Sequence, residues 1–156
     1  MIQEPNQLNI IIGDDETAAT DIVKGLCISI SGINVVGIAH SERMLVAKIN
    51  HANPDLILLN LNNRMGGIDV MNTIREIDPD LNVIVLYSQK DHDSDNLINA
   101  LELGVYECIE KPGQADSRQY KEFRLRLLTI AGLLSSRKRF SKRKTPYYGS
   151  KFFTQG

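Results

Sequence analysis

The sequence lacks any hydrophobic run that approaches the ~20 consecutive apolar residues needed to span a bilayer. Its first residues, MIQEPNQLN, contain no basic segment followed by an apolar one, so they do not have the form of a secretory signal peptide. We therefore expect a cytoplasmic protein with no membrane partner.

Cysteine and histidine are both scarce. The two cysteines, Cys27 and Cys108, form no CxxC pair, and no neighbouring Cys or His completes a zinc set. Both are expected to be small buried apolar residues rather than metal ligands or a disulfide. The three histidines, His40, His51 and His92, fall on separate segments and form no obvious triad or metal set, so each is expected on the surface or in a helix.

Acidic residues are absent from residues 137–156, which hold seven Lys and Arg. Residues 1–136 hold all 19 acidic residues and 11 Lys and Arg, so the two parts carry net charges of +7 and −8. This asymmetry predicts an acidic domain, residues 1–136, followed by a basic tail or linker, residues 137–156. The tail is expected to be extended or disordered, because it shows no helical period and contains a proline and two glycines.

Five short segments rich in branched apolar residues alternate with longer segments whose apolar residues recur three and four positions apart. The short segments predict β-strands and the longer ones predict α-helices. The strands are expected at residues 8–12, 34–38, 55–59, 82–86 and 105–109, and the last helix at about residues 117–136. Strict alternation of this kind predicts an α/β fold, a five-stranded parallel sheet flanked by five helices.

The functional site of such a sheet lies at the carboxyl ends of its strands. This rule selects residues 13–16, 60–63, 87–88 and 110–112. Asp14 and Asp15 follow the first strand, and two adjacent carboxylates there could hold Mg²⁺ together with a third oxygen ligand. An equally good interpretation is that one of them caps the helix that follows. Lys111, which precedes a proline after the fifth strand, would place a cation at the same edge.

Together these features resemble the receiver domain of two-component response regulators, over about residues 8–136. The stretches NPDLILLNLNNRMGGIDV and ALELGVYECIEKP carry the resemblance. The receiver half of chemotaxis methylesterases is the most similar, although the third strand also resembles receivers of DNA-binding regulators. The resemblance implies a flavodoxin-like, doubly wound sheet with strand order 2-1-3-4-5. It also implies a Mg²⁺ site, an aspartate that accepts a phosphoryl group from a histidine kinase, and contact of Lys111 with the phosphate.

Asn60 stands at the position of that acceptor aspartate. A neutral carboxamide lacks the charged oxygen that attacks phosphorus, but it can offer a carbonyl oxygen to a cation and N–H donors to Asp14 or Asp15. Loss of one negative charge should weaken Mg²⁺ binding by on the order of 1–4 kcal/mol. We therefore expect a weak Mg²⁺ site with Asp14, Asp15, Asn60 and Asn62 as its ligands.

Three further positions depart from the family's pattern. The loop after Asn60 is one residue short and lacks the usual proline. Tyr87 occupies the place of the Thr or Ser that hydrogen-bonds the phosphoryl oxygens, with Ser88 one position later. Cys108 occupies the place of the switch aromatic, and Tyr106, two residues earlier, is expected on the same face of the sheet.

The preferred hypothesis is a receiver that is not phosphorylated at Asn60 and acts through protein–protein interaction, with a histidine kinase or an output protein as partner. A homodimer is a further expectation. The alternative is a conventional Mg²⁺-dependent receiver whose acceptor aspartate has been changed to asparagine. Methylesterase activity is not expected, because the chain has no GxSxG motif. Binding of nucleic acid by the basic run from Arg137 to Lys144 is a less favoured hypothesis than a solvated linker.

Overall fold

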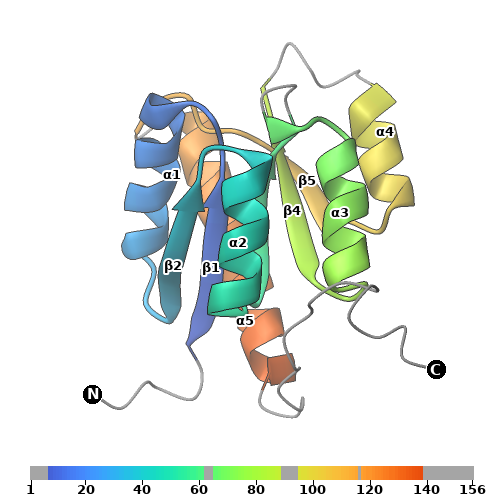
Figure 1. Ribbon diagram of the computed structural model, residues 1–156. Helices are drawn as coiled ribbons and strands as arrows, with labels where there is room; N and C mark the ends of the chain where they lie inside the picture. The colour runs from blue at the N-terminus through green and yellow to red at the C-terminus, as the bar shows by residue number, and fades with distance from the viewer. Residues whose placement is uncertain (1–6, 62–64, 89–94, 116, 139–156) are drawn as a thin grey trace, which may run out of the picture.

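The computed structural model describes residues 7–61, 65–88, 95–115 and 117–138, and strands and helices alternate along this part of the chain (Figure 1). The elements are β1 (Leu8–Gly13), α1 (Thr17–Ile28), β2 (Ile33–Ala39), α2 (Glu42–Ala52), β3 (Leu56–Asn60), α3 (Asp69–Ile77), β4 (Asn82–Tyr87), α4 (Asp95–Glu102), β5 (Glu107–Glu110) and α5 (Arg118–Lys138). Within the described ranges no helix is long and apolar enough to cross a membrane.

The strands form one sheet in the order β2-β1-β3-β4-β5, and every neighbouring pair is parallel. This confirms the predicted flavodoxin-like, doubly wound fold. The order reverses at β1, because β2 lies on one side of it and β3 on the other. The carboxyl ends of β1 and β3 are therefore neighbours at this reversal, where ligands of open α/β sheets bind.

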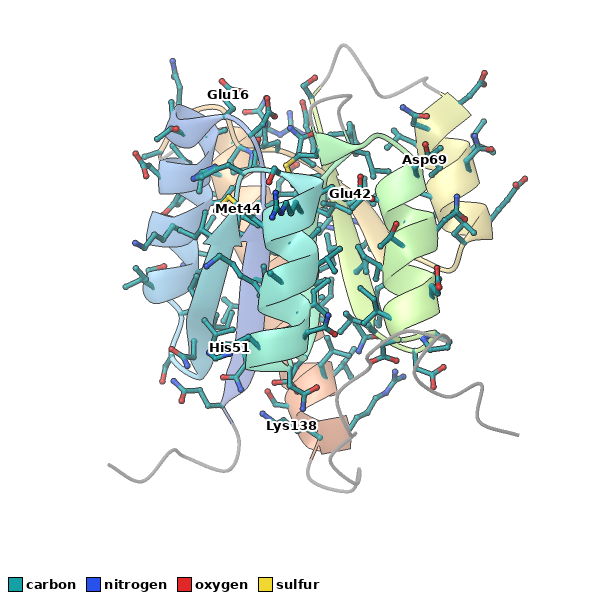
Figure 2. The ribbon with its side chains drawn as sticks, viewed as in Figure 1. Glu16, Glu42, Met44, His51, Asp69 and Lys138 are labelled. Carbon is teal, nitrogen blue, oxygen red and sulfur yellow. The ribbon has the colours of Figure 1, made fainter. Side chains whose placement is uncertain are left out.

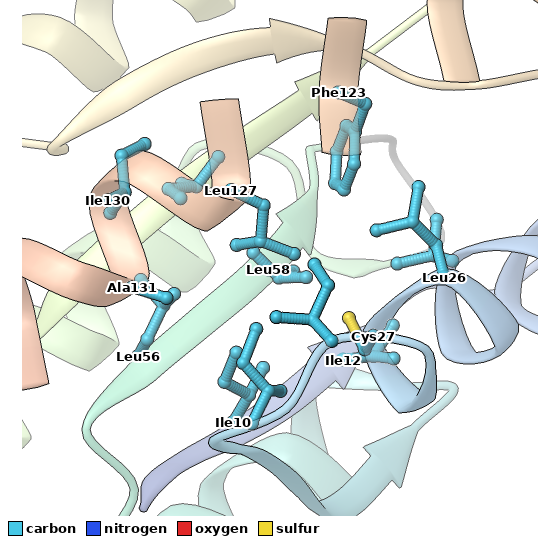
Figure 3. Close-up of a cluster of buried hydrophobic side chains, with 14 of the residues drawn as sticks. Ile10, Ile12, Leu26, Cys27, Leu56, Leu58, Phe123, Leu127, Ile130 and Ala131 are labelled. Carbon is cyan, nitrogen blue, oxygen red and sulfur yellow. The ribbon is translucent and has the colours of Figure 1, made fainter. Parts of the chain in front are cut away.

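Helices cover both faces of the sheet. Figure 3 shows the core between the sheet and the pair α1 and α5, where Ile10, Ile12 and Leu58 meet Phe123 and Leu127. The alternate residues of the same strands point to the opposite face, which α2, α3 and α4 cover. Each fully buried Leu, Ile or Phe side chain stabilises the fold by roughly 1.5–3 kcal/mol relative to exposure. The apolar runs of β1 and β3 thus form two cores at once.

Two element boundaries differ from the predicted ones by two residues, and several others differ by one residue. The fifth strand was expected from residue 105, but it begins at Glu107. Gly104, with φ +79°, ends α4, and the Val105 N–H donates to the Ala100 carbonyl, so Val105 belongs to the helix cap. The last helix begins at Arg118, capped by Ser117, and it ends at Lys138, two residues beyond the predicted end.

The extension of α5 has a specific cause at its end. The ammonium of Lys138 donates to the Gln7 carbonyl at 2.7 Å and to Oδ2 of Asp55 at 2.9 Å. The same Asp55 oxygen accepts the backbone N–H of Asn9. These contacts hold the last turn of α5 against the amino-terminal edge of the sheet. Figure 2 shows Lys138 at this edge, at the opposite end of the domain from Glu16. A separate tail at residues 137–156 stays a prediction.

Candidate functional site

Three chain segments bring Asp14, Asn60 and Lys111 together. Asp14 directly follows β1, Asn60 is the last residue of β3, and Lys111 directly follows β5. Because the strands are parallel, all three positions lie at the same edge of the sheet. The backbone N–H of Lys111 donates to the Tyr87 carbonyl at 2.7 Å, which ties the end of β5 to the end of β4.

Asp14 is the centre of this cluster, and only 1% of it is exposed. Its Oδ2 accepts the Lys111 ammonium at 3.1 Å. Its Oδ1 accepts the Asn60 amide N–H at 3.2 Å and the backbone N–H of Glu16 at 2.9 Å. Both oxygens of this buried carboxylate are thus hydrogen-bonded, as a buried charge requires.

Lys111 is enclosed as well, with 11% of its side chain exposed. It forms a second ion pair with Glu16, whose Oε2 lies 3.6 Å from the ammonium nitrogen. The Glu16 side chain is 65% exposed, so this second pair lies in water and contributes little. The pair with Asp14 is the stronger one, because the Asp14 carboxylate is buried and little of the Lys111 side chain is exposed.

His40 belongs to the cluster, although the sequence alone assigns it no role. Its Nδ1 lies 2.7 Å from the backbone carbonyl oxygen of Asp14. A carbonyl oxygen can only accept, so Nδ1 carries the proton. His40 directly follows β2, so the strand-end rule extended to the second strand also selects it. His51 lies exposed in α2, as expected, and His92 lies outside the described residues.

The remaining predicted positions differ from one another in burial and in surroundings. Asp15 and Tyr87 are half-buried, and Ser88 lines a pocket beside Lys111. Asn62, expected as a metal ligand, lies outside the described residues. Cys108 lies in β5, and burial raises the pKa of its thiol.

Cys108 and Tyr106 do not share a face, which corrects the expectation. Cys108 packs against the core under α2, α3 and α4, whereas Tyr106 packs against the core under α1 and α5. The alternation of a strand does not apply to Tyr106, because β5 begins one residue later at Glu107. Cys27 is fully buried, as expected, and desolvation by burial raises the pKa of its thiol from 9.0 to about 12.

Between β3 and α3, residues 65–68 are described, and they form a tight turn although the family's proline is missing from this part of the sequence. Met65 is fully buried, and Gly66 and Gly67 both have positive φ, +95° and +57°. A Cβ on Gly66 would lie 2.7 Å from Oε2 of Glu42, and the other oxygen of that carboxylate accepts the Thr73 hydroxyl at 3.0 Å. The two glycines therefore turn the chain, and at Gly66 a side chain would not fit. Figure 2 shows Glu42 at the end of α2 that faces this edge.

The described side chains fit a Mg²⁺ ion poorly. They include no group of three or more His, Cys, Asp or Glu residues that could hold a metal. The negative charge of Asp14, the most buried carboxylate at the site, is already met by the Lys111 ammonium. A dication at Asp14 would approach this ammonium at close range, and like charges repel.

A pocket of about 460 Å³ opens beside the cluster. It lies between the start of α1 and the segment that joins β5 to α5. Its lining includes Glu16, Ser88, Lys111, Gln114 and Ser117. Lys111 thus contacts Asp14 and also lines this pocket, so a molecule in the pocket would meet the Lys111 side chain.

Comparison with known proteins agrees with this geometry. The chain is 35% identical over 107 residues to a protein-glutamate methylesterase/protein-glutamine glutaminase of Desulfotalea psychrophila, a match over 67% of this chain and 29% of that protein. A protein of the same name from Bacillus subtilis is 29% identical over 136 residues, which cover 85% of this chain and 38% of that protein. The chain thus spans between 29% and 38% of the length of these two relatives.

Among solved structures, the response regulator domain of Thermotoga maritima CheB has the same fold, with a TM-score of 0.69 and 23% identity. The match covers 83% of this chain and 97% of that one. The receiver domain of the putative response regulator NarL from Mycobacterium tuberculosis superposes with a TM-score of 0.60 at 25% identity, over 81% of this chain and 97% of that one. The family model described as the response regulator receiver domain matches residues 10–119. The chain therefore belongs to the response regulator receiver domain family.

Proposed function

We propose that this receiver domain works as a protein-binding module and does not accept a phosphoryl group at Asn60. The observation that carries the proposal is the position of the Asn60 amide, whose nitrogen donates to the Asp14 carboxylate at 3.2 Å. The residue at the acceptor position thus acts as a hydrogen-bond donor within the cluster. A nucleophile would need a localised negative charge on an oxygen, which a carboxamide lacks.

The contacts of Lys111 support the same proposal. Its ammonium pairs with Asp14 in a nearly closed environment and with Glu16 at the rim. The charge of Asp14 is therefore balanced within the chain, without a phosphate or a metal ion. The side chains at this edge hold one another in place, and the lysine charge is already paired.

The alternative of a conventional acceptor changed to asparagine is less well supported. A single change from Asp to Asn would leave the other positions of the site regular. Tyr87 in place of a small hydroxyl residue, Cys108 in place of the switch aromatic, and the shortened loop closed by Gly66 are three independent departures.

We infer that the signal passes to or from a partner protein, such as a histidine kinase or an output protein. The relatives named as methylesterases extend well beyond the matched region. We assign to the matched residues of this chain the part of a receiver rather than ester hydrolysis, because the family model that they match is the response regulator receiver domain. Cys27 is buried and its thiol pKa is raised, which opposes formation of a thiolate.

Intact-protein mass spectrometry with acetyl phosphate, with and without Mg²⁺, tests the proposal. The protein should gain no phosphoryl mass, and beryllofluoride should give no change in its NMR spectrum at the residues around Asn60. A phosphoryl adduct mapped to this pocket would contradict the proposal.

The variant Asn60→Asp separates the two hypotheses. Under our proposal, acceptance should stay slow and should not change partner binding or oligomeric state, because Tyr87, Cys108 and the short loop remain. Fast Mg²⁺-dependent labelling together with altered oligomerisation would favour the conventional receiver. Asn53→Asp, a change of the same kind at the end of α2, is the matched control for nonspecific labelling.

A further inference from the structure

The pocket beside Lys111 has the size of a site for a small organic molecule. Its volume is about 460 Å³, and proteins bind such molecules in pockets of roughly 300–1,000 Å³. The lining comes from the start of α1, from Ser88 after β4 and from residues 110–119. Figure 2 shows Glu16, one of the lining residues, at the start of α1. The pocket is therefore built from segments that only the fold brings together.

One part of the lining is aliphatic. Ala18, Ala19 and Ile22 are three and four residues apart on α1, so they share one side of that helix, and Pro112 contributes from the segment after β5. We call these four residues the apolar wall. Among the described residues that line the pocket none is aromatic, so the pocket offers no ring on which a planar aromatic ligand could stack. The apolar wall suits a chain of methylene groups.

The other part of the lining carries two carboxylates. Glu110, the last residue of β5, is half-buried, and its side chain forms no hydrogen bond or ion pair with another described residue. A partly desolvated carboxylate without a partner gains from a cation that donates hydrogen bonds to it. Glu16 supplies the second carboxylate. It is 65% exposed and lies 3.6 Å from the Lys111 ammonium, so it can accept from a second cation as well.

The charge of Lys111 does not cancel these two carboxylates. Its ammonium is paired with Asp14 at 3.1 Å, so this ion pair as a whole is neutral and Glu16 and Glu110 remain as two negative charges at the pocket. Residues 1–117 hold seven Lys and Arg against 18 acidic residues, a net charge of −11. The field of the domain therefore attracts cations to this pocket and opposes a phosphate or a carboxylate ligand.

Two amide side chains complete the polar part of the pocket. Gln114 and Gln119 both line it, and neither side chain has a hydrogen-bond partner among the described residues. Each amide has a carbonyl oxygen that accepts N–H groups. An alkylammonium group carries three N–H donors, so a carboxylate and an amide oxygen together can satisfy most of them.

We propose that this pocket binds a linear aliphatic polyamine. One ammonium group pairs with Glu110, a second pairs with Glu16, and the methylene groups between them lie against the apolar wall. A divalent metal ion is a poorer match, because the apolar wall offers it no ligand. The described part of the chain also contains no group of three His, Cys, Asp or Glu residues that could hold a metal. The proposal does not depend on whether Asn60 accepts a phosphoryl group, since Asn60 does not line the pocket.

A lysine side chain of another protein carries the same ammonium on an aliphatic stem. A free polyamine matches the pocket better, because it brings a second ammonium for the second carboxylate. The experiment therefore compares spermidine with the peptide acetyl-Ala-Lys-Ala-amide. Triethylene glycol, a neutral flexible chain, and glutarate, a dicarboxylate, are the chemical controls.

Titration calorimetry of the full chain in a low-salt buffer free of Mg²⁺ measures the binding. Spermidine should bind saturably at one site, more weakly as sodium chloride is added, and more tightly than the peptide. The two controls should not bind. In a ¹H–¹⁵N NMR spectrum, the amide shifts that spermidine changes should be concentrated at residues 16–22 and 110–119.

Two variants test the two parts of the lining. Glu110→Gln removes a charge at nearly constant shape, and Ala18→Leu fills the pocket from an exposed position of α1, so each should bind spermidine about ten-fold more weakly. The matched controls are Glu102→Gln on α4 and Ala47→Leu on α2, which are exposed, do not line the pocket and should leave binding unchanged. Thermal melts of all four variants should stay close to that of the unmodified protein.

Several results would overturn the proposal. Absence of saturable spermidine binding would do so, and so would equal binding by Glu110→Gln, Ala18→Leu and their controls, which would place spermidine elsewhere on the acidic surface. Binding of triethylene glycol or glutarate as tight as that of spermidine would show that the two carboxylates do not select the ligand. Tighter binding of the peptide would assign the pocket to a lysine side chain of a protein, and the free polyamine would be wrong.

Discussion

The ammonium nitrogen of Lys111 lies 3.1 Å from Oδ2 of Asp14, across 97 positions of sequence. The two side chains are 11% and 1% exposed, so this ion pair is almost completely withdrawn from water. Three of the hydrogen bonds at the site converge on this one carboxylate. The stability of the sheet edge at the carboxyl ends of the strands, and the response of this edge to ions, should therefore depend on this ion pair.

Replacing Lys111 by methionine should lower the free energy of unfolding by on the order of 3 kcal/mol, because it leaves Asp14 buried without its counter-charge. Urea denaturation followed by circular dichroism measures the change. Lys24→Met is the control, since Lys24 is exposed on α1 and should change stability by less than about 0.5 kcal/mol. Equal stabilities of the two variants would show that the ion pair contributes nothing net.

Mg²⁺ should bind the unmodified protein weakly, because the dication competes with the Lys111 ammonium for Asp14. Titration calorimetry should show binding at least about ten-fold tighter in Lys111→Met, since a unit positive charge has been removed. Asp14→Asn should abolish the binding. Tight Mg²⁺ binding that persists in Asp14→Asn and in Asp15→Ala would place the metal elsewhere in the chain.

Arg75 should be hard to replace, even by lysine. Its guanidinium donates to the carbonyls of Leu103 at 2.7 Å, Leu81 at 2.7 Å and Gly104 at 3.0 Å, which joins α3 to the end of α4 and the start of β4. A lysine ammonium cannot span three acceptors in this planar arrangement. Arg75→Lys should cost about 2 kcal/mol.

Hydrogen exchange tests whether this loss is local. The amide of Gly104, which donates to the Leu101 carbonyl, should exchange faster in Arg75→Lys. The amides of β1 should lose protection only as far as global stability falls. An equal loss of amide protection across α4 and β1 would show that Arg75 has no specific effect on the end of α4.

Two truncations separate the last turn of α5 from the tail. A chain that ends at Lys138 should melt like the full chain, because the Lys138 contacts with Gln7 and Asp55 remain. A chain that ends at Ser136 should be less stable by about 1–2 kcal/mol, since it loses a charged donor to two acceptors. Thermal melts and urea titrations distinguish the two chains. A large loss on removing only residues 139–156 would show that the tail itself packs on the domain.

The buried thiol of Cys27 should make the protein less stable at high pH. Burial raises its pKa from 9.0 to about 12, so the folded protein keeps the proton between these values while the unfolded chain releases it. The unfolded state is then favoured as pH rises, and stability should fall by up to about 1.4 kcal/mol per pH unit in that interval. The stabilisation by the buried, protonated Cys27 thiol is fully present below pH 9.0.

Cys27→Ala isolates this effect from other groups that titrate at high pH. The variant should be less stable near neutrality, because a buried side chain becomes smaller, but its stability should fall less steeply above pH 9.0. The measurement is the urea midpoint of both proteins at several pH values. Parallel pH profiles would show that Cys27 is not responsible.

Local sequence pattern determined the architecture and the edge of the sheet that holds the site. The branched apolar runs that became β1 and β3 are buried on both faces, which only a parallel sheet between two helical layers satisfies. The residues that follow such strands share one edge as a matter of geometry, so the order of residues alone selects Asp14, Asn60 and Lys111. The identity of Asn60, and with it the loss of the nucleophilic oxygen, is likewise a fact of sequence.

Only the tertiary structure decided which groups meet at that edge and which do not. The sequence alone does not show that Lys111 pairs with Asp14, that the Asn60 amide donates to Asp14 rather than Asp15, or that His40 binds the Asp14 carbonyl oxygen, because each contact depends on side-chain conformation across non-neighbouring segments. For the same reason Lys138 is tied to Asp55, 83 positions away. Periodicity detects neighbours three or four residues apart, whereas buried charges pair according to three-dimensional distance and the exclusion of water.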